Sequence, residues 1–289
     1  MNGILLINKP KNYTSHDIVY KVKKIVKEKV GHTGTLDPNA TGILPLLIGK
    51  ATHISKYLIN HDKIYESTIY LGEKRDTADI EGNIIEEKRV NYDLLNKEHV
   101  EEILNRMIGR RKQVPPIYSA IKVNGKKLYE YARSNQKVEI NSRDIEIYKI
   151  KLINIEKNII DFRVFCSKGT YIRTLCEEIA ERLDTVGYMK ELTRIQVGNF
   201  NIKDAINIEQ LEDNIETKEF LDSKLVTIEN YFKNKNKIIL KDEELIKFLN
   251  GVTIFCNLKD DLYRIYDENK NFIGIANLKN KKLKRDVIL

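Results

Sequence analysis

Apolar residues recur along this chain in two spacings, one typical of strands and one typical of helices. Continuous or alternating apolar runs predict strands at 3–8, 43–48, 63–71, 118–123, 145–155 and 159–166. Spacings of three and four residues predict helices at 98–107, 127–134 and 170–183, and one from the capping-box pair Thr14 and Asp17 through Val26. Strands and helices do not alternate regularly, so we predict an α+β fold rather than a doubly wound parallel sheet.

The pattern changes toward the end of the chain. Residues 207–236 are polar and charged with weak periodicity, and we place a domain boundary near their end. Beyond it, short apolar runs predict strands at 238–240, 252–255, 262–266, 272–276 and 283–288, with one helix at 243–249 among them. We therefore predict a larger domain over residues 1–235 and a small β-rich module with a basic end over residues 236–289.

Composition and charge change this picture only slightly. Lys and Arg number 50 against 42 Asp and Glu, a moderate excess that fits a partner made of phosphates but also an ordinary solvated surface. The three cysteines form no C-x-x-C pair, which indicates a reduced, cytoplasmic protein. No segment approaches the run of about 20 apolar residues that spans a bilayer, so we expect no membrane insertion.

One loop concentrates residues with special backbone requirements. Residues 31–42 read G-H-T-G-T-L-D-P-N-A-T-G and hold one carboxylate, Asp37, between Leu36 and Pro38. Glycine adopts positive φ without strain and proline fixes φ, so such a loop can hold one side chain at a set angle, as a nucleophile requires. Asp-Pro also opens ordinary turns. These residues alone leave a catalytic and a turn-forming role for Asp37 equally open.

Two further stretches carry candidate chemistry. Residues 167–174, S-K-G-T-Y-I-R-T, place Arg173 in the first turn of a helix, where backbone N–H groups together with Lys168 favour an anion. Arg173 could pair with a catalytic carboxylate, contact RNA phosphate or be an ordinary surface arginine. Residues 115–133 interleave basic residues with tyrosines, as RNA-binding surfaces do, although a tyrosine packing stripe on a helix explains them equally well.

The spacing of other residues disfavours nucleotide and metal chemistry. A phosphate-binding P-loop would need Gly at Leu44 and Ser or Thr at Ala51. The five histidines form no H-x-x-x-H pair and have no cysteine at zinc spacing. We therefore expect neither a nucleotide nor a metal site.

Together these stretches resemble one family, the bacterial tRNA pseudouridine synthases of the TruB type. The motifs follow the order of that family at 3–15, 31–45, 62–65 (D-K-I-Y), 75–82 (R-D-T-A-D-I-E-G), 115–122 (P-P-I-Y-S-A-I-K) and 168–173 (K-G-T-Y-I-R). The resemblance covers about residues 3–200. One departure is Asn12, where the family usually has Gly; asparagine tolerates left-handed backbone, so the turn can form. The module after Asn236 looks shorter than a complete PUA domain.

The resemblance implies a pseudouridine synthase fold, a mixed and mostly antiparallel sheet flanked by helices, followed by a PUA-like module. It implies that Asp37 is the catalytic aspartate, that Tyr65 stacks on the flipped base and removes its C5 proton, and that Arg173 keeps Asp37 ionised. Attack at C1′, attack at C6 and a glycal intermediate all stay open for Asp37. The isomerisation needs no redox step or energy input, so no cofactor is expected.

Supporting roles follow from the same resemblance. Asp79 would balance the charge of Arg173 or cap a turn, and His32 would enter the RNA stem where the base leaves or stabilise its own loop. An insertion over about residues 110–142 would grip RNA. Phosphate contacts, with plain surface positions as the alternative, are expected at Lys9, Lys122, Arg133 and Lys168.

The partner implied by the resemblance is the T-arm stem-loop of tRNA, with uridine 55 as the target of a monomeric enzyme that flips the base out of its stack. Two other functions stay open. One is a guide-dependent rRNA pseudouridine synthase, which shares the catalytic loop but has a longer PUA domain. The other is a non-catalytic tRNA-binding or tRNA-folding protein, against which the intact set of Asp37, Tyr65 and Arg173 speaks.

Overall fold

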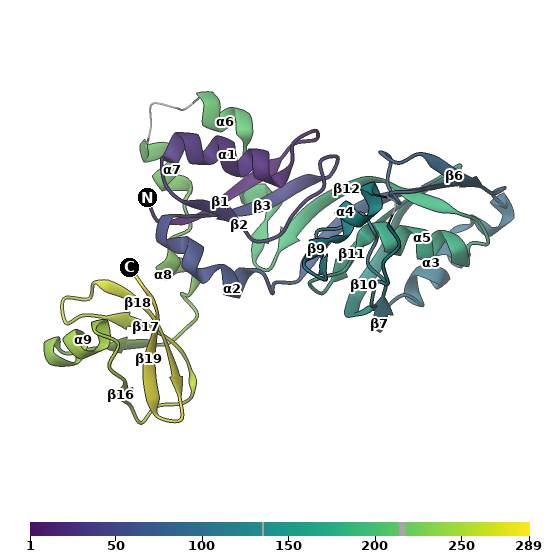
Figure 1. Ribbon diagram of the computed structural model, residues 1–289. Coiled ribbons are helices and arrows are strands. Elements are labelled where there is room, and N and C mark those ends of the chain that lie inside the picture. The colour runs from purple at the N-terminus through teal and green to yellow at the C-terminus, as the bar shows by residue number, and fades with distance from the viewer. Residues whose placement is uncertain (135, 214–217) are drawn as a thin grey trace.

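A ten-stranded mixed sheet forms the larger part of the protein (Figure 1). The computed structural model describes residues 1–134, 136–213 and 218–289; Asn135 of the predicted insertion and residues 214–217 of the predicted weakly periodic region lie outside them. Along the sheet the strands are β14 (Ile206–Asn207), β1 (Gly3–Lys9), β3 (Thr41–Ile48), β12 (Gly187–Val197), β4 (Lys63–Leu71), β11 (Ile159–Cys166), β10 (Arg143–Glu156) and β7 (Gly109–Gln113). β2 (Val30–His32) pairs with β3, and β13 (Phe200–Asn201) pairs with β12.

The helices pack on the sheet through the faces that their apolar spacing predicts. α1 (Ser15–Val26) begins at a capping box between Thr14 and Asp17, which confirms that prediction, and it buries its apolar stripe against β1 and β3. α3 (Lys97–Asn105) and α5 (Ile172–Arg182) pack on the half of the sheet formed by β4, β11 and β10. The predicted α+β class is therefore confirmed, with most neighbouring strands antiparallel.

One prediction about local structure fails, and other elements were not predicted. Residues 118–123 form no strand apart from β8 (Lys122–Val123), which pairs with β9 (Lys126–Lys127) across the Asn124-Gly125 turn. The weakly periodic region contains the short helices α6 (Ile208–Asp213), α7 (Lys218–Lys224) and α8 (Ile228–Tyr231). The apolar spacing predicts no strand at β12, which lies between β3 and β4 in the middle of the sheet.

A second sheet follows α8 and lies at one end of the molecule, away from β10 and β7 (Figure 1). Its strands are, in order, β15 (Lys237–Ile239), β17 (Asp261–Tyr266), β18 (Phe272–Lys279), β19 (Lys282–Ile288) and β16 (Ile254–Phe255), with α9 (Asp242–Leu249) packed beside them. Ile275 and Val287 of this sheet share an apolar cluster with Ile54 and Phe232. The Asp286 carboxylate of β19 also accepts hydrogen bonds from the Lys56 and Tyr57 side chains. The C-terminal sheet and the larger domain therefore meet through a packed contact.

Shorter elements connect these layers. They are the 3-10 helices η1 (Gly49–Ile54), η2 (Tyr92–Leu94) and η3 (Ile202–Asp204), the helices α2 (Ser55–Leu58) and α4 (Leu128–Arg133), and the hairpin strands β5 (Glu73–Arg75) and β6 (Ile84–Glu87). Within the described ranges, no helix is long and apolar enough to cross a membrane.

Candidate active site

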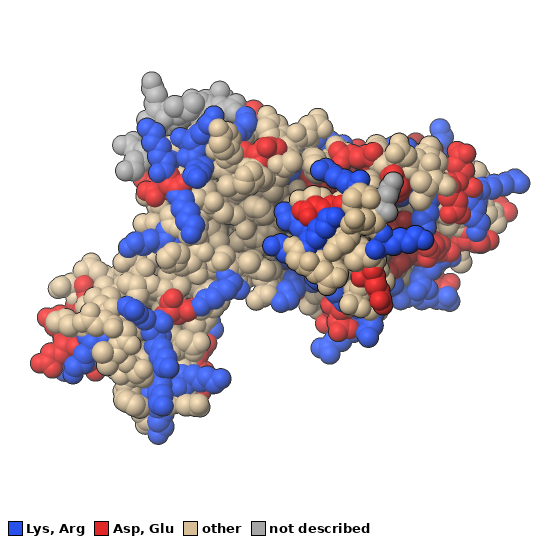
Figure 2. Space-filling model, viewed as in Figure 1, with Lys and Arg blue, Asp and Glu red and all other residues tan. Residues whose placement is uncertain are grey.

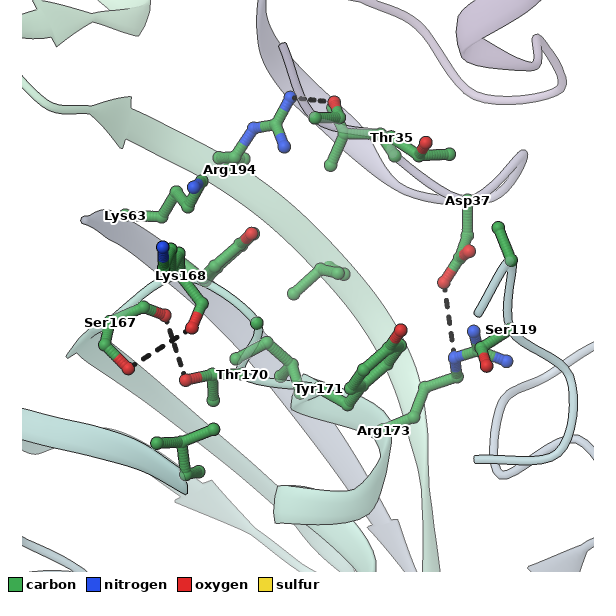
Figure 3. A pocket seen from close by; sticks show the side chains of 18 of the residues that line it. Thr35, Asp37, Lys63, Ser119, Ser167, Lys168, Thr170, Tyr171, Arg173 and Arg194 are labelled. Carbon is green, nitrogen blue, oxygen red and sulfur yellow. Dashed lines mark hydrogen bonds and ion pairs between the residues drawn. The ribbon is translucent and has the colours of Figure 1, made fainter. Parts of the chain in front are cut away.

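A cavity of about 700 Å³ opens between the Gly31–Gly42 loop, β4, β12 and the start of α5. Its lining brings together Asp37, Tyr65 and Arg173, which lie far apart in the sequence. Figure 3 shows Asp37 and Arg173 at one end of this pocket and Arg194 at the other. A volume of this size lies in the range of small-ligand sites and is large enough for one nucleotide base with its sugar.

The backbone on the N-terminal side of Asp37 is fixed by a buried serine of α1. The Ser15 hydroxyl donates to the Leu36 carbonyl oxygen at 3.1 Å and accepts from the Leu36 N–H at 2.8 Å. The Leu36 side chain is itself buried in the core below the pocket. One hydroxyl therefore satisfies both backbone groups of the residue that precedes the carboxylate, which limits the angles that Asp37 can take.

The backbone on the other side is fixed by the first motif of the chain. The Pro38 carbonyl accepts from the Asn12 N–H at 3.0 Å and from the Lys9 ammonium at 3.1 Å. Asn12 has φ 65°, so asparagine does adopt the left-handed backbone expected at the position where the family usually has Gly. Lys9 is fully buried and donates to two more carbonyls, and burial lowers its pKa to about 8. The expected phosphate contact at Lys9 is therefore wrong for this structure, where Lys9 braces the Gly31–Gly42 loop.

The Arg173 guanidinium contacts four residues that lie in three other segments of the chain. Its Nε lies 3.3 Å from Asp37 Oδ2, and its Nη1 lies 3.4 Å from Asp79 Oδ2. The same group donates to the carbonyls of Thr77 and Tyr118, at 3.2 and 2.9 Å. Asp79 is nearly buried and also accepts from the Thr77 hydroxyl, so its position is set from two sides. The structure thus brings together the three charged residues that the sequence motifs single out.

Burial and neighbouring charges act on the pKa of the Asp37 carboxyl in opposite directions. Burial raises its pKa above the ordinary value, the Arg173 charge opposes that rise, and the neighbouring Asp79 carboxylate adds to it. Arg173 therefore favours the ionised form, as expected, without outweighing burial. The side chain of Asp37 keeps 35% of its surface exposed, so it is accessible from the pocket while its partner arginine is not.

The Tyr65 ring lies at the other end of the pocket, beside a residue that the sequence motifs missed. Tyr65 is on β4, directly opposite Arg194 on β12, so the two side chains share one face of the sheet. Burial raises the pKa of Tyr65, and the Arg194 charge opposes this rise. Arg194 is 1% exposed and lines the pocket. The sequence around Arg194 gave no clear signal of a buried charge, because Lys190, Glu191 and Thr193 precede it in the same stretch.

A second missed cation lies on the same side. Lys63 precedes Tyr65 by two residues on β4, is almost fully buried and lines the pocket. Its ammonium donates to the carbonyls of His61 and Ile59, and burial together with the Arg194 charge lowers its pKa to about 8. This end of the pocket is therefore electropositive, whereas the Asp37 end holds two carboxylates.

His32 ends β2 and lies within the Gly31–Gly42 loop. It is half-buried, its Nδ1 is buried without a hydrogen-bond partner, and burial lowers its pKa, with the Arg194 charge adding to the effect. A neutral imidazole with a free ring nitrogen at the edge of the loop fits either of the roles expected for it.

The remaining cations expected to contact RNA lie on the surface. Lys168 is exposed at the pocket and donates to the Asn60 side chain. Lys122 is exposed on β8, and the guanidinium of Arg133 lies 5.5 Å from the ring centre of Tyr129. In Figure 2, Lys and Arg side chains gather over the region of α4 and β9. All three cations are exposed, and their contact with a phosphate backbone stays a prediction.

The sequence comparisons agree with this site. Family models match residues 22–172 (TruB family pseudouridylate synthase, N-terminal domain), 173–233 (tRNA pseudouridylate synthase B C-terminal domain) and 237–284 (pseudouridine synthase II TruB, C-terminal). The chain belongs to the TruB family of pseudouridylate synthases. It is similar to the tRNA pseudouridine synthase B of Clostridium kluyveri, with 43% identity over 98% of both chains. It also resembles that of Clostridium perfringens strain 13, with 40% identity over 100% of this chain and 99% of the relative.

Solved structures extend the likeness to the fold. The protein in a crystal structure of a Cbf5-Nop10-Gar1 complex superposes with a TM-score of 0.70 over 99% of this chain and 83% of that one, at 23% identity. At this identity the likeness concerns the fold alone. The expected pseudouridine synthase fold with an added β-rich module is thereby confirmed.

Proposed function

We propose that this protein isomerises uridine 55 in the T-arm of tRNA to pseudouridine, with Asp37 as its catalytic carboxylate. The observation that carries the proposal is the Asp37 carboxylate, paired with buried Arg173 at 3.3 Å and open to a cavity of about 700 Å³. Membership of the TruB family and the names of full-length relatives support tRNA as the substrate.

The geometry supports a reaction on a base that has left its stack. The Asp37 carboxylate lines the pocket, so a target nucleotide stacked in the T-loop has to be flipped into the pocket at a cost of a few kcal/mol. The Tyr65 ring offers a stacking surface for that base. Asp37 then acts on C1′, on C6 or through a glycal intermediate, and Arg173 holds its charge in place.

The segment around β8, β9 and α4 fits the proposed RNA-gripping role of the insertion over about residues 110–142. Its lysines lie over tyrosine rings, with Lys126 Nζ 4.7 Å from the centre of Tyr131 and Lys127 Nζ 5.3 Å from that of Tyr129. The Tyr118 carbonyl links this segment to Arg173. This hydrogen bond gives the insertion a direct contact with the arginine that pairs with Asp37.

The C-terminal module offers a second basic surface. β19 carries Lys282, Lys284 and Arg285, and Figure 2 shows Lys and Arg side chains running over it. We assign residues 1–235 to the catalytic domain and 236–289 to a PUA-like RNA-binding module of a monomeric, cytoplasmic enzyme. Cofactor-free chemistry is part of the proposal, because the isomerisation changes neither oxidation state nor composition.

The test uses the purified protein and an unmodified tRNA transcript, with pseudouridine mapped by carbodiimide modification and primer extension. We expect one new site at position 55, none in a transcript with cytidine there, and the same product in an isolated T-arm stem-loop. A requirement for an added guide RNA would favour the rRNA enzyme instead. Tight binding of tRNA without any product would favour the non-catalytic tRNA-binding protein.

A further inference from the structure

Arg194 is the largest side chain that the described part of the chain buries completely, and it is 1% exposed. No carboxylate among the described residues forms an ion pair with it, whereas Arg173 in the same pocket has two. Burying an unpaired guanidinium costs several kcal/mol in desolvation. A residue retained at that cost has a use for its charge or for its particular hydrogen-bonding geometry.

One use of the Arg194 side chain is to hold backbone carbonyls in place. Arg194 Nε donates to the Ile43 carbonyl at 2.8 Å, and Nη2 donates to the Gly34 carbonyl at 3.1 Å. These carbonyls lie on opposite sides of Asp37 in the loop. At Gly42, which has φ +109°, a Cβ would come within 2.2 Å of the Arg194 carbonyl oxygen. The catalytic loop therefore wraps closely around Arg194, with glycine where the contact is tightest.

A second use of the Arg194 side chain concerns Tyr65 on the neighbouring strand. Arg194 and Tyr65 are directly opposite each other on β12 and β4, so their side chains share one face of the sheet, and both line the pocket. The other charged or titratable groups that act on this phenol are the Cys166 thiol of β11 and the Asp37 carboxylate of the loop. Of these groups, Arg194 is the one whose charge favours an ionised phenol.

Two carbonyls alone do not explain an arginine, because a neutral amide side chain also donates hydrogen bonds to carbonyls without a buried charge. We propose that Arg194 is a positioning residue that holds Tyr65 beside the Gly31–Gly42 loop and stabilises its oxygen as the phenolate, which then accepts a proton from the substrate base. This inference rests on the proposed function, since it assigns a role within the same pocket.

In the proposed step, the proton on C5 of the base passes to Tyr65 and then to solvent. After C5 of the detached uracil has bonded to C1′, the Tyr65 phenolate takes the C5 proton, and the electron pair of the C5–H bond restores the C5=C6 double bond. N1, which has lost its bond to C1′, takes up a proton from water, so that the product is an isomer of the substrate. Tyr65 leaves the step as a neutral phenol and returns its proton to solvent.

The test compares Arg194→Lys and Arg194→Gln, with Arg163→Gln on exposed β11 as the matched control. Single-turnover rates on tRNA transcript are measured across a range of pH, together with tRNA affinity and melting temperature. We expect Arg194→Gln to slow the reaction by about 100-fold, and Arg194→Lys by about tenfold, at neutral pH with near-normal affinity. For both, the rate should recover at higher pH, because a phenol without the arginine needs a more alkaline solution to ionise.

Two further variants separate this role from loss of structure. Placing a fluorinated tyrosine, whose phenol ionises at lower pH, at position 65 should restore part of the rate of Arg194→Gln. Adding Arg194→Gln to the Tyr65→Phe variant should slow the reaction by a further factor of less than about three, because the two residues act in one step.

Equal slowing at every pH, no rescue by the fluorinated tyrosine and additive losses with Tyr65→Phe would overturn the inference and leave Arg194 a purely structural clamp. An inactive wild-type protein would instead refute the proposed function, so the two failures are distinguishable.

Discussion

The two ends of the pocket bury an arginine in opposite ways. Arg173 lies between the carboxylates of Asp37 and Asp79, so its charge is compensated and one carboxylate is held toward the cavity. Arg194 has no such partner among the described residues and is surrounded by carbonyls and the Tyr65 phenol. The difference indicates a division of labour, in which one end carries a negative group ready to react and the other end is ready to receive negative charge.

The largest effect is expected from removing the compensated arginine. Arg173→Met would leave the nearly buried Asp79 and the Asp37 carboxylate without their ion-pair partner, and breaking such a pair costs about 3–5 kcal/mol. We expect no detectable pseudouridine and a clearly lower free energy of unfolding, measured by urea denaturation. Arg173→Lys keeps the charge and should recover much of the stability but little of the activity. Equal stability of Arg173→Met and wild type would contradict the comparison.

The next effect concerns the uncompensated end. Tyr65→Phe keeps the ring that stacks and removes only the hydroxyl, so tRNA should bind nearly normally while the single-turnover rate falls by about 100-fold or more. The measurement pairs a binding titration with a rate on the same preparation. A wild-type rate would limit Tyr65 to stacking and remove the reason for placing Arg194 beside it.

A smaller effect is expected on the surface. Lys122→Ala and Arg133→Ala should each weaken tRNA binding and reduce the slope of log affinity against log salt by about one unit, through loss of one phosphate contact. Lys9→Met is the contrasting variant, because the buried Lys9 ammonium braces Pro38. It should lower the melting temperature and leave the salt slope unchanged; an altered slope would return Lys9 to the RNA surface.

The smallest effect is a shift in pH dependence. Burial raises the pKa of Asp37 and Asp79 adds to the rise, so the rate should fall with decreasing pH at a higher pH than an ordinary aspartate would cause. Asp79→Asn removes the neighbouring negative charge and should therefore lower the pKa of Asp37 and move this acid limb to lower pH. The pH–rate profile of the two proteins checks the direction, and a move to higher pH would show that Asp79 acts on Asp37 mainly by holding Arg173.

The same two ends differ in how well the sequence predicts them. Asp37, Asp79 and Arg173 stand in distinctive local motifs, and the glycines and proline around Asp37 restrict its backbone within a few residues. Arg194 lies in a strand whose neighbours β3 and β4 come from distant parts of the chain, and the charged residues Lys190 and Glu191 in it obscure any alternation. Its role depends on contacts that exist only after the sheet has formed.

The pattern of apolar and polar residues also does not predict which charged side chains are buried. Lys9 follows an apolar strand and precedes Pro10, so nothing local distinguishes a surface lysine from one that donates to three carbonyls. Strand β4, by contrast, was predicted with its observed bounds, because alternate residues along it are buried. Local periodicity therefore predicted the elements well, and the pairing of distant segments decided which charges became functional.

The central claim is that Asp37 reacts with the flipped nucleotide. Asp37→Asn keeps the shape of the side chain but can neither attack carbon nor accept a proton. The fold should tolerate the change and melt at the same or a higher temperature, because a carboxyl whose pKa is raised by folding destabilises the folded state above that pKa.

The decisive measurement maps pseudouridine in a single turnover of Asp37→Asn and titrates tRNA binding with the same preparation. The account predicts no product and an affinity within about tenfold of wild type, or roughly 1.4 kcal/mol, since many phosphate contacts share the binding energy. Product formed at a rate near that of wild type would contradict the account and remove Asp37 from the reaction.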